Sequence, residues 1–361
     1  MAITATILPK TCFSENLPDL KIKDCSDPAT ISIQIDEQSI ISNVELLPDK
    51  TKTIIIYLRQ LVRLIPPLFS PKQSDLKSYK PCPILKITIQ RAGESLLQSC
   101  RLIPGGTRFD ISDMTDFLDA NFLTWQPQII ETTHTQPQFL TTAIQTGRAV
   151  RTTLYTKDGR AFTRTIWSSV QIGCHQMKAD FSTLWANECS LRKLDPICYD
   201  IEGYFTVNGE VISNKPFAQR YILRPERCGE TCFGFVNSLG SIDTLMMIGK
   251  MKLKPESENK TFMNREVETE LSNSYTSYWE ASTGYIDSPG MAAQYQDFLK
   301  STNRWIYQNG EWLRIVVDEY KLEHTPRELN AYTFKYHLAA RNERRYFERK
   351  ELPDVELPVI F

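Results

Sequence analysis

The chain has 361 residues, 41% hydrophobic and 24% charged, a balance typical of a folded globular protein with room for two or three domains. Its 42 Lys and Arg residues against 43 Asp and Glu residues leave a net charge of -1, which excludes a general attraction to nucleic acid or to an anionic membrane. The 20 prolines indicate many loops and sheet edges, because proline is poorly tolerated inside helices and central strands.

The first ten residues do not predict an export signal, because no basic start is followed by a sustained apolar run. No stretch approaches the roughly 18 apolar residues of a membrane span. The nearest candidate, 53–69, is interrupted by Arg59, Arg63 and a proline pair. We therefore expect synthesis in a cytoplasm, where the nine cysteines would stay reduced.

The N-terminal third is expected to hold an arm and a small domain. Residues 1–28 are polar, contain three prolines and carry little periodicity, so they predict an extended arm. Residues 29–105 predict a small β domain with one helix. Isoleucine alternates with polar residues over 30–36, which is typical of a half-buried strand. Apolar spacing over 53–65 predicts a helix that ends at the proline pair, although its first residues could begin as a strand.

Turn signals predict a largely antiparallel β architecture. Asp-Gly or Asn-Gly lies between runs of aromatic and β-branched residues at 155–162, 204–212 and 305–315. These residue pairs favour the two-residue type I′ turn, which needs positive φ at both central positions. A further hairpin is expected around Ala92-Gly93.

The remaining segments predict two larger β domains and a tail. Residues 106–138 are expected to form a linker, 139–225 a β domain, and 226–340 a β domain that contains a helix over 289–301. That helix would begin at Pro289 after a serine cap. Residues 341–361 are expected to form a C-terminal arm. The predicted fold class is mainly β, with two to three antiparallel β-sandwich or barrel-like domains and a few short helices.

Two short strands, 251–254 and 267–271, are expected on either side of a polar loop. Lys250, Lys252 and Lys254 would then lie on one solvent face, where lysines protect an exposed sheet edge against aggregation.

Familiar catalytic and cofactor motifs are absent from the sequence, so no catalytic residue and no cofactor is expected. Cys228 and Cys232 have a spacing that could suit zinc, but a structural zinc site needs four ligands, and small buried residues in a turn are the alternative. Cys174 and His175 would face opposite sides of a strand. His337 is expected to be solvated on the polar face of the strand 332–338.

Two groups of residues are candidates for recognition. The aromatic group could bind sugars or anchor a protein interface, or else fill a core beside the helix 289–301; it comprises Tyr275, Tyr278, Trp279 and Tyr285. The basic group is interleaved with glutamates, which favours contacts between subunits over a phosphate track; it comprises Arg341, Arg344, Arg345, Arg349 and Lys350.

Several general patterns follow one another along the chain: a turn at 46–50 runs into 53–61, and much later come 282–286, 298–301, 312–317 and 332–338. This order resembles β-rich structural proteins of phages and prophages of Bacteroides-type bacteria, of the tail-tip or baseplate kind. The resemblance implies a virion subunit made in the host cytoplasm, present in several copies and bound to other tail proteins. It implies no catalytic residues.

Two other classes stay open. A glycan-binding or adhesin-like β-sandwich protein would carry an exposed aromatic platform around 275–285, and a phage tail tip can itself bind host surface glycan. An unrecognised hydrolase would carry a concave pocket with paired carboxylates. The sequence favours a non-enzymatic subunit that acts through protein–protein assembly.

Overall fold

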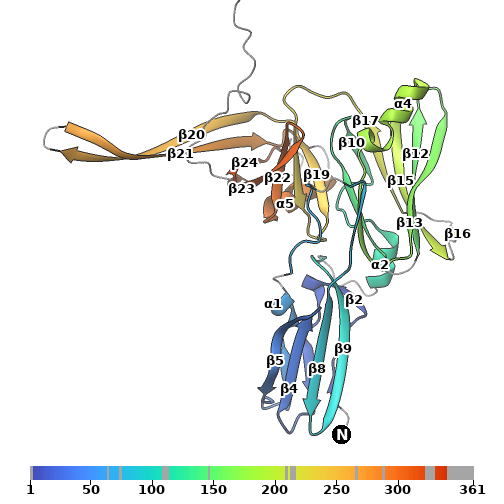
Figure 1. Ribbon diagram of the computed structural model, residues 1–361, viewed down its shortest axis with the longest axis vertical. Helices are drawn as coiled ribbons and strands as arrows, with labels where there is room; N and C mark the ends of the chain where they lie inside the picture. Colours follow the sequence, from blue (N-terminus) through green and yellow to red (C-terminus); the bar gives the residue numbers. More distant parts are fainter. Residues whose placement is uncertain are drawn as a thin grey trace, which may run out of the picture.

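The computed structural model describes most of the chain, in ten ranges: 3–62, 65–72, 75–107, 114–144, 147–207, 210–211, 217–264, 267–286, 289–321 and 330–339. Strands dominate these ranges, almost all pairings are antiparallel, and the helices are short, so the predicted mainly β fold class is confirmed. Three bodies meet at a common junction, and one long hairpin projects from them (Figure 1). Among the described residues, no helix is both long and apolar enough to cross a membrane.

The N-terminal body is a β-sandwich of a five-stranded and a three-stranded sheet, with strand orders β2-β9-β8-β4-β5 and β1-β3-β6. Its elements are β1 (Thr4–Ala5), β2 (Thr11–Phe13), η1 (Ser14–Asn16), β3 (Leu20–Lys23), β4 (Ala29–Ile35), β5 (Gln38–Leu46), β6 (Ile54–Ile56), α1 (Leu58–Val62), β8 (Ile84–Arg91) and β9 (Glu94–Ile103). The first 28 residues, expected to form an extended arm, instead supply three of these strands. Leu20 and Ile22 are fully buried in the sandwich core, which explains why this segment folds onto the sheets.

The helix expected over 53–65 is shorter in the structure. Ile54–Ile56 forms β6 and pairs with β3, and only Leu58–Val62 is helical. Consecutive β-branched residues lose side-chain freedom in a helix and pack well on a sheet, which accounts for the difference.

The central body also has two sheets, with strand orders β10-β17-β15-β12-β13 and β11-β14-β7. Its elements are β7 (Lys77–Lys80), α2 (Met114–Ala120), β10 (Ile129–Thr132), β11 (Phe139–Ile144), β12 (Arg148–Thr156), β13 (Ala161–Ser169), β14 (Gly173–Lys178), α3 (Phe181–Leu184), α4 (Ala186–Arg192), β15 (Pro196–Val207), β16 (Glu210–Val211) and β17 (Phe217–Leu223). The expected linker 106–138 therefore contributes a helix and a strand, since β10 pairs in parallel with β17. β7, expected within the first domain, pairs with β14.

The C-terminal body is a seven-stranded sheet, with strand order β19-β18-β22-β23-β24-β21-β20, and one packed helix. Its elements are β18 (Thr231–Val236), β19 (Ile242–Met247), β20 (Met251–Asn264), β21 (Val267–Ser282), α5 (Pro289–Lys300), β22 (Arg304–Gln308), β23 (Glu311–Lys321) and β24 (Thr333–Leu338). The helix matches the predicted range. Its Phe298 ring packs edge-on against Phe233 and Phe334 of the sheet, with centroids 5.7 and 5.2 Å away.

The predicted turns form hairpins where the structure describes them. Asn309 and Gly310 both have positive φ, 51° and 83°, as a type I′ turn requires, and they join β22 to β23. At the first signal only Gly159 has positive φ, and the loop closes through a hydrogen bond from the Thr156 amide to the Arg160 carbonyl. The second turn, 208–209, lies outside the described residues, but its flanking residues pair as β15 and β16.

The three bodies share a buried apolar cluster, which we call the junction core. It comprises Phe13, Phe69, Cys82, Ile103, Leu118, Leu123, Phe139, Ala143, Cys174, Cys232, Leu239, Ile242, Trp305 and Trp312. Backbone also meets backbone here: a side chain at Gly240 would collide with the Pro104 carbonyl oxygen, 1.7 Å from the position of its Cβ. Only glycine fits this approach of the β18–β19 turn to the end of β9.

A buried polar network lies beside the junction core. The side-chain NH₂ group of Gln126 donates to the Gln138 side-chain oxygen at 3.2 Å and to the Thr244 backbone carbonyl at 3.1 Å. Asp243, which is fully buried, accepts from the Thr124 hydroxyl at 2.6 Å and from the Trp125 amide at 3.3 Å. Burial raises the pKa of Asp243 to about 7, although these hydrogen bonds act to lower it.

The raised pKa of Asp243 makes stability pH-dependent. The folded chain holds this proton to a higher pH than the unfolded chain, so its contribution is complete below pH ~4 and is lost as the pH rises through ~7. Between pH ~5 and ~8 the wild type should lose up to about 3 kcal/mol of unfolding free energy through Asp243, and we expect Asp243→Asn to abolish this loss. Denaturant unfolding across this range measures it.

The exposed carboxyl of Glu37 provides the control, and Glu37→Gln should keep the wild-type pH profile. An Asp243→Asn profile with the wild-type slope would contradict the assignment.

Candidate functional site

The most prominent surface feature is the projecting part of the β20–β21 hairpin, residues 254–264 and 267–278, which we call the hairpin arm (Figure 1). β24 pairs with β21 only from Trp279 to Ser282, so beyond that point the two strands pair only with each other among the described residues. At about 3.3 Å per residue the arm extends about 40 Å. An isolated two-stranded hairpin is marginally stable in water, which makes this length unusual for a free element.

The base of the hairpin arm is held on both faces of the sheet. On one face Trp279 stacks on Tyr336, with centroids 5.8 Å apart. On the other face the Lys335 ammonium lies 2.5 Å from a Glu256 oxygen and 4.1 Å from the centre of the Tyr278 ring. The hydrogen bond to Glu256 raises the pKa of Lys335. These contacts orient the arm with respect to the sheet.

The predicted aromatic group does not form one platform. Tyr278 and Trp279 are half-buried on opposite faces of β21, and Tyr285 is 68% exposed in the loop that follows. Tyr275 lies on the arm opposite Ser257, and its side chain is outside the description. The base of the arm is thus built from residues that were expected either in a core or at a recognition site.

The predicted basic group lies outside the described residues: Arg341, Arg344, Arg345, Arg349 and Lys350. His337, expected to be solvated, is instead 6% exposed, because Tyr278 packs over it and its Nδ1 lies 2.8 Å from an Asp318 oxygen. Cys228 is exposed, whereas Cys232 is buried in the junction core. The described residues contain no group of three potential metal ligands.

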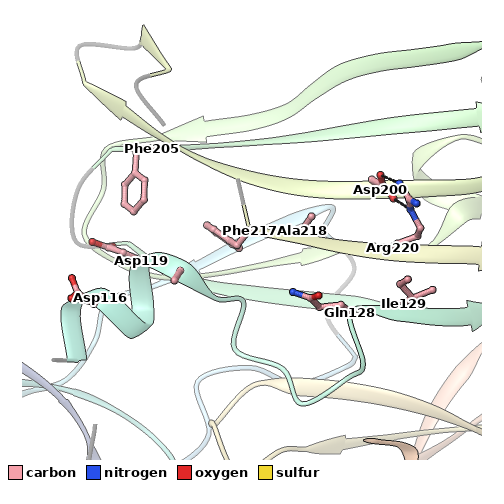
Figure 2. Close-up of a pocket in the computed structure, with 10 residues that line it drawn as sticks. Asp116, Asp119, Gln128, Ile129, Asp200, Phe205, Phe217, Ala218 and Arg220 are labelled. Atoms are coloured by element: carbon pink, nitrogen blue, oxygen red, sulfur yellow. Dashed lines mark hydrogen bonds and ion pairs between the residues drawn. The ribbon is translucent and has the colours of Figure 1, made fainter. Parts of the chain in front are cut away.

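A second candidate is an open groove of about 770 Å³ on the central body, between α2, the start of β10 and the strands β15 and β17 (Figure 2). Its lining mixes aromatic rings with charged groups: Asp116, Asp119, Ala120, Gln128, Ile129, Asp200, Phe205, Phe217, Ala218 and Arg220. No sequence motif marked these residues, because they come from four elements that only the fold brings together.

A fully buried arginine lies behind this groove and contacts three of the residues that line it. The Arg148 guanidinium lies 4.6 and 4.8 Å from the centres of the Phe205 and Phe217 rings, and its Nη2 lies 2.9 Å from an Asp119 carboxylate oxygen. Burial lowers the pKa of Arg148 to about 10, while Asp119 acts in the opposite direction. One signal was present in the sequence: Arg148 immediately precedes the apolar pair Ala149-Val150 in β12.

The arginine that lines the groove itself, Arg220, is half-exposed. Arg220 forms a two-pronged hydrogen bond with Asp200, at 2.7 and 2.6 Å, as Figure 2 shows. This contact raises the pKa of Arg220. Asp119 and Asp200 are thus each paired with an arginine, an arrangement that favours holding a polar ligand over acid–base chemistry.

A smaller cleft of about 560 Å³ lies between the central and C-terminal bodies. It is lined in part by Lys178, Asp180 and Trp312, and by Gly310 from the tip of the third predicted hairpin. The tip of this hairpin therefore lies beside a cleft between two bodies of the same chain.

Comparisons with known proteins do not identify a family: no family model and no curated protein matches the chain. Rst D1-D2 is 7% identical, and the match covers 62% of this chain and 99% of that chain, with a TM-score of 0.19. The titin I-band fragment I67–I69 is 8% identical, and the match covers 94% of this chain and 88% of the fragment, also with a TM-score of 0.19. A Ca²⁺-stabilized ice-binding adhesin of an Antarctic bacterium is 10% identical, and the match covers 80% of this chain and 71% of the adhesin chain, with a TM-score of 0.15. TM-scores this low carry no argument about function.

The buried ion pair beneath the groove generates a stability prediction. Asp119→Asn leaves the Arg148 guanidinium without its opposite charge in a buried site, so we expect a loss of about 2 to 4 kcal/mol in unfolding free energy. Urea unfolding monitored by circular dichroism measures the loss. The exposed pair Lys157–Asp195 is the control, and Asp195→Asn should leave the urea midpoint unchanged. Equal midpoints for the two variants would refute the prediction.

Proposed function

We propose that the chain is a structural subunit that assembles with other copies of itself through the hairpin arm. The observation that carries the proposal is the length of the arm beyond the last residue of β21 that pairs with β24. Among the described residues, no third strand pairs with this part of the hairpin, and a neighbouring subunit would supply one.

The arm has the chemistry of an interface. Its two outer edges present backbone N–H and C=O groups that an added strand can pair with. Leu253 at its base and Phe262 near its tip are 56% and 52% exposed, so each places an apolar side chain where a partner would cover it. Lys254 and Glu256 form ion pairs with Glu280 and Lys335 of the same chain, and the exposed Lys260 adds a positive charge that would help to fix the register of a docked partner.

Within this proposal, the assembly is a phage tail or a related tail-like particle, at a tip, baseplate or connector position. Support comes from the segment order described above, the mainly β fold and the projecting hairpin arm. The other partners would be further tail proteins, and the location would be the virion. Cryo-microscopy of a purified particle tests this assignment, and a particle whose density has no place for this chain would refute it.

The groove supports an alternative function, the binding of a glycan. Its half-exposed Arg220, its aspartates and its aromatic rings are groups that bind sugar hydroxyls and ring faces. A glycan array distinguishes this function: binding that is lost in Arg220→Ala but kept when the hairpin arm is shortened would place recognition in the groove.

Shortening the arm tests the assembly proposal. Glu256 and Thr276 pair directly, so residues 257–275 can be replaced by Asn-Gly to give a short hairpin that keeps the Lys335 contact at the base. We expect the wild type to sediment as an oligomer and the shortened chain as a monomer, with an unchanged melting temperature because the core of the C-terminal body is intact.

The control for this experiment is Leu97→Ser, which alters an exposed apolar residue of the N-terminal body and should preserve the oligomer. A shortened chain that sediments like the wild type would overturn the proposed role of the arm.

A further inference from the structure

Two cysteine side chains meet inside the junction core. The Cys82 and Cys174 sulfur atoms lie 3.6 Å apart, although the residues are 92 positions apart in the chain. Cys174 is 1% exposed and Cys82 is 9% exposed. Both cysteines are free thiols in this structure.

The pair lies where the chain crosses from one body to another. β7 pairs with β14 in the central body, and β8 belongs to the N-terminal sandwich, so 81–83 is one of the segments in which the chain crosses between these bodies. Cys82 is the middle residue of this crossing, between Pro81 and Pro83, whose rings restrict the local backbone.

The backbone around the partner sulfur is tightly packed. Gly173 precedes Cys174 at the start of β14, and a side chain there would lie 2.7 Å from the Lys80 carbonyl oxygen. Cys174 itself pairs with Lys80 across the two strands. The start of β14 and the crossing segment are therefore in direct contact.

We propose that Cys82 and Cys174 are an oxidation site that forms a disulfide between the crossing segment and β14 when the protein meets a peroxide. The Cys82 thiolate attacks one peroxide oxygen, the O–O bond breaks, and a sulfenic acid forms as hydroxide leaves. The Cys174 sulfur then attacks the Cys82 sulfur, the S–O bond breaks, and water leaves with the Cys174 proton. Two thiols are oxidised and one peroxide is reduced.

The order of the two steps follows from the environment of each sulfur. A hydrogen bond with Cys174 lowers the pKa of the Cys82 thiol, and the same contact together with burial raises the pKa of Cys174. The thiolate is the reactive form, so Cys82 attacks first. Elsewhere in the chain burial raises the pKa of Cys189 and of Cys232, which makes these thiols less reactive.

The disulfide would close a long loop and tie the crossing segment between the N-terminal and central bodies to β14. Closing a long loop stabilises the folded chain, mainly by restricting the unfolded one. The inference does not depend on the proposed assembly, because it rests on two residues far in the sequence from the hairpin arm.

Hydrogen peroxide treatment of the purified, fully reduced chain tests the proposal. A Cys228→Ser background removes an exposed thiol that could link two chains. After treatment, thiols are alkylated in denaturant and the peptides are mapped. We expect a linked peptide pair containing Cys82 and Cys174, a loss of two hydrogen masses, and a rise in melting temperature of about 5 °C or more.

Cys82→Ser in this background should lose both the linked peptide and the rise in melting temperature, whereas Cys189→Ser should keep both. Recovery of Cys82 and Cys174 as alkylated thiols, as higher oxides, or bonded to other cysteines would overturn the proposal. If Cys82→Ser does not fold, the peptide map of the background protein decides the question alone.

Discussion

A carboxyl group buried away from water must be hydrogen-bonded or give up its charge, and Asp243 is subject to this constraint. Its donors, Thr124 and Trp125, come from the segment that leads into β10, whereas Asp243 itself lies in β19. The central and C-terminal bodies therefore cannot separate at this point without stripping a buried acid of its partners. Together with the junction core, this contact makes them one platform, on which the groove, the cleft and the hairpin arm have defined places.

Local sequence signals predicted the elements that depend on local chemistry. Asn309-Gly310 adopts the two positive φ angles expected of it, and the helix predicted from Pro289 begins there and buries Tyr295, Phe298 and Leu299. The signals failed where partners distant in sequence decide the structure. Residues 1–28 carry little periodicity, yet Leu20 and Ile22 enter a core because β6, more than thirty positions later, pairs with their strand.

The candidate sites were harder to predict for the same reason. The segment 255–260 is rich in polar residues and was expected to form a loop, but pairing with β21 makes it strand. Behind the groove, Arg148 contacts rings that follow it by dozens of residues, and the thiol pair joins β14 to the crossing segment between β7 and β8. No spacing rule applies to such pairs, because contacts between distant segments follow from the packing of whole sheets.

The contacts on both faces of the sheet at the base of the hairpin arm determine where its tip lies. The Trp279–Tyr336 stack on one face and the contacts of Lys335 on the other set the angle at which the arm leaves the sheet. Over about 40 Å, a rotation of about 10° at this base displaces the tip by about 7 Å, more than the spacing between neighbouring strands. The curvature of any ring or tube built from such subunits would therefore be set at the base of the arm and not at its tip.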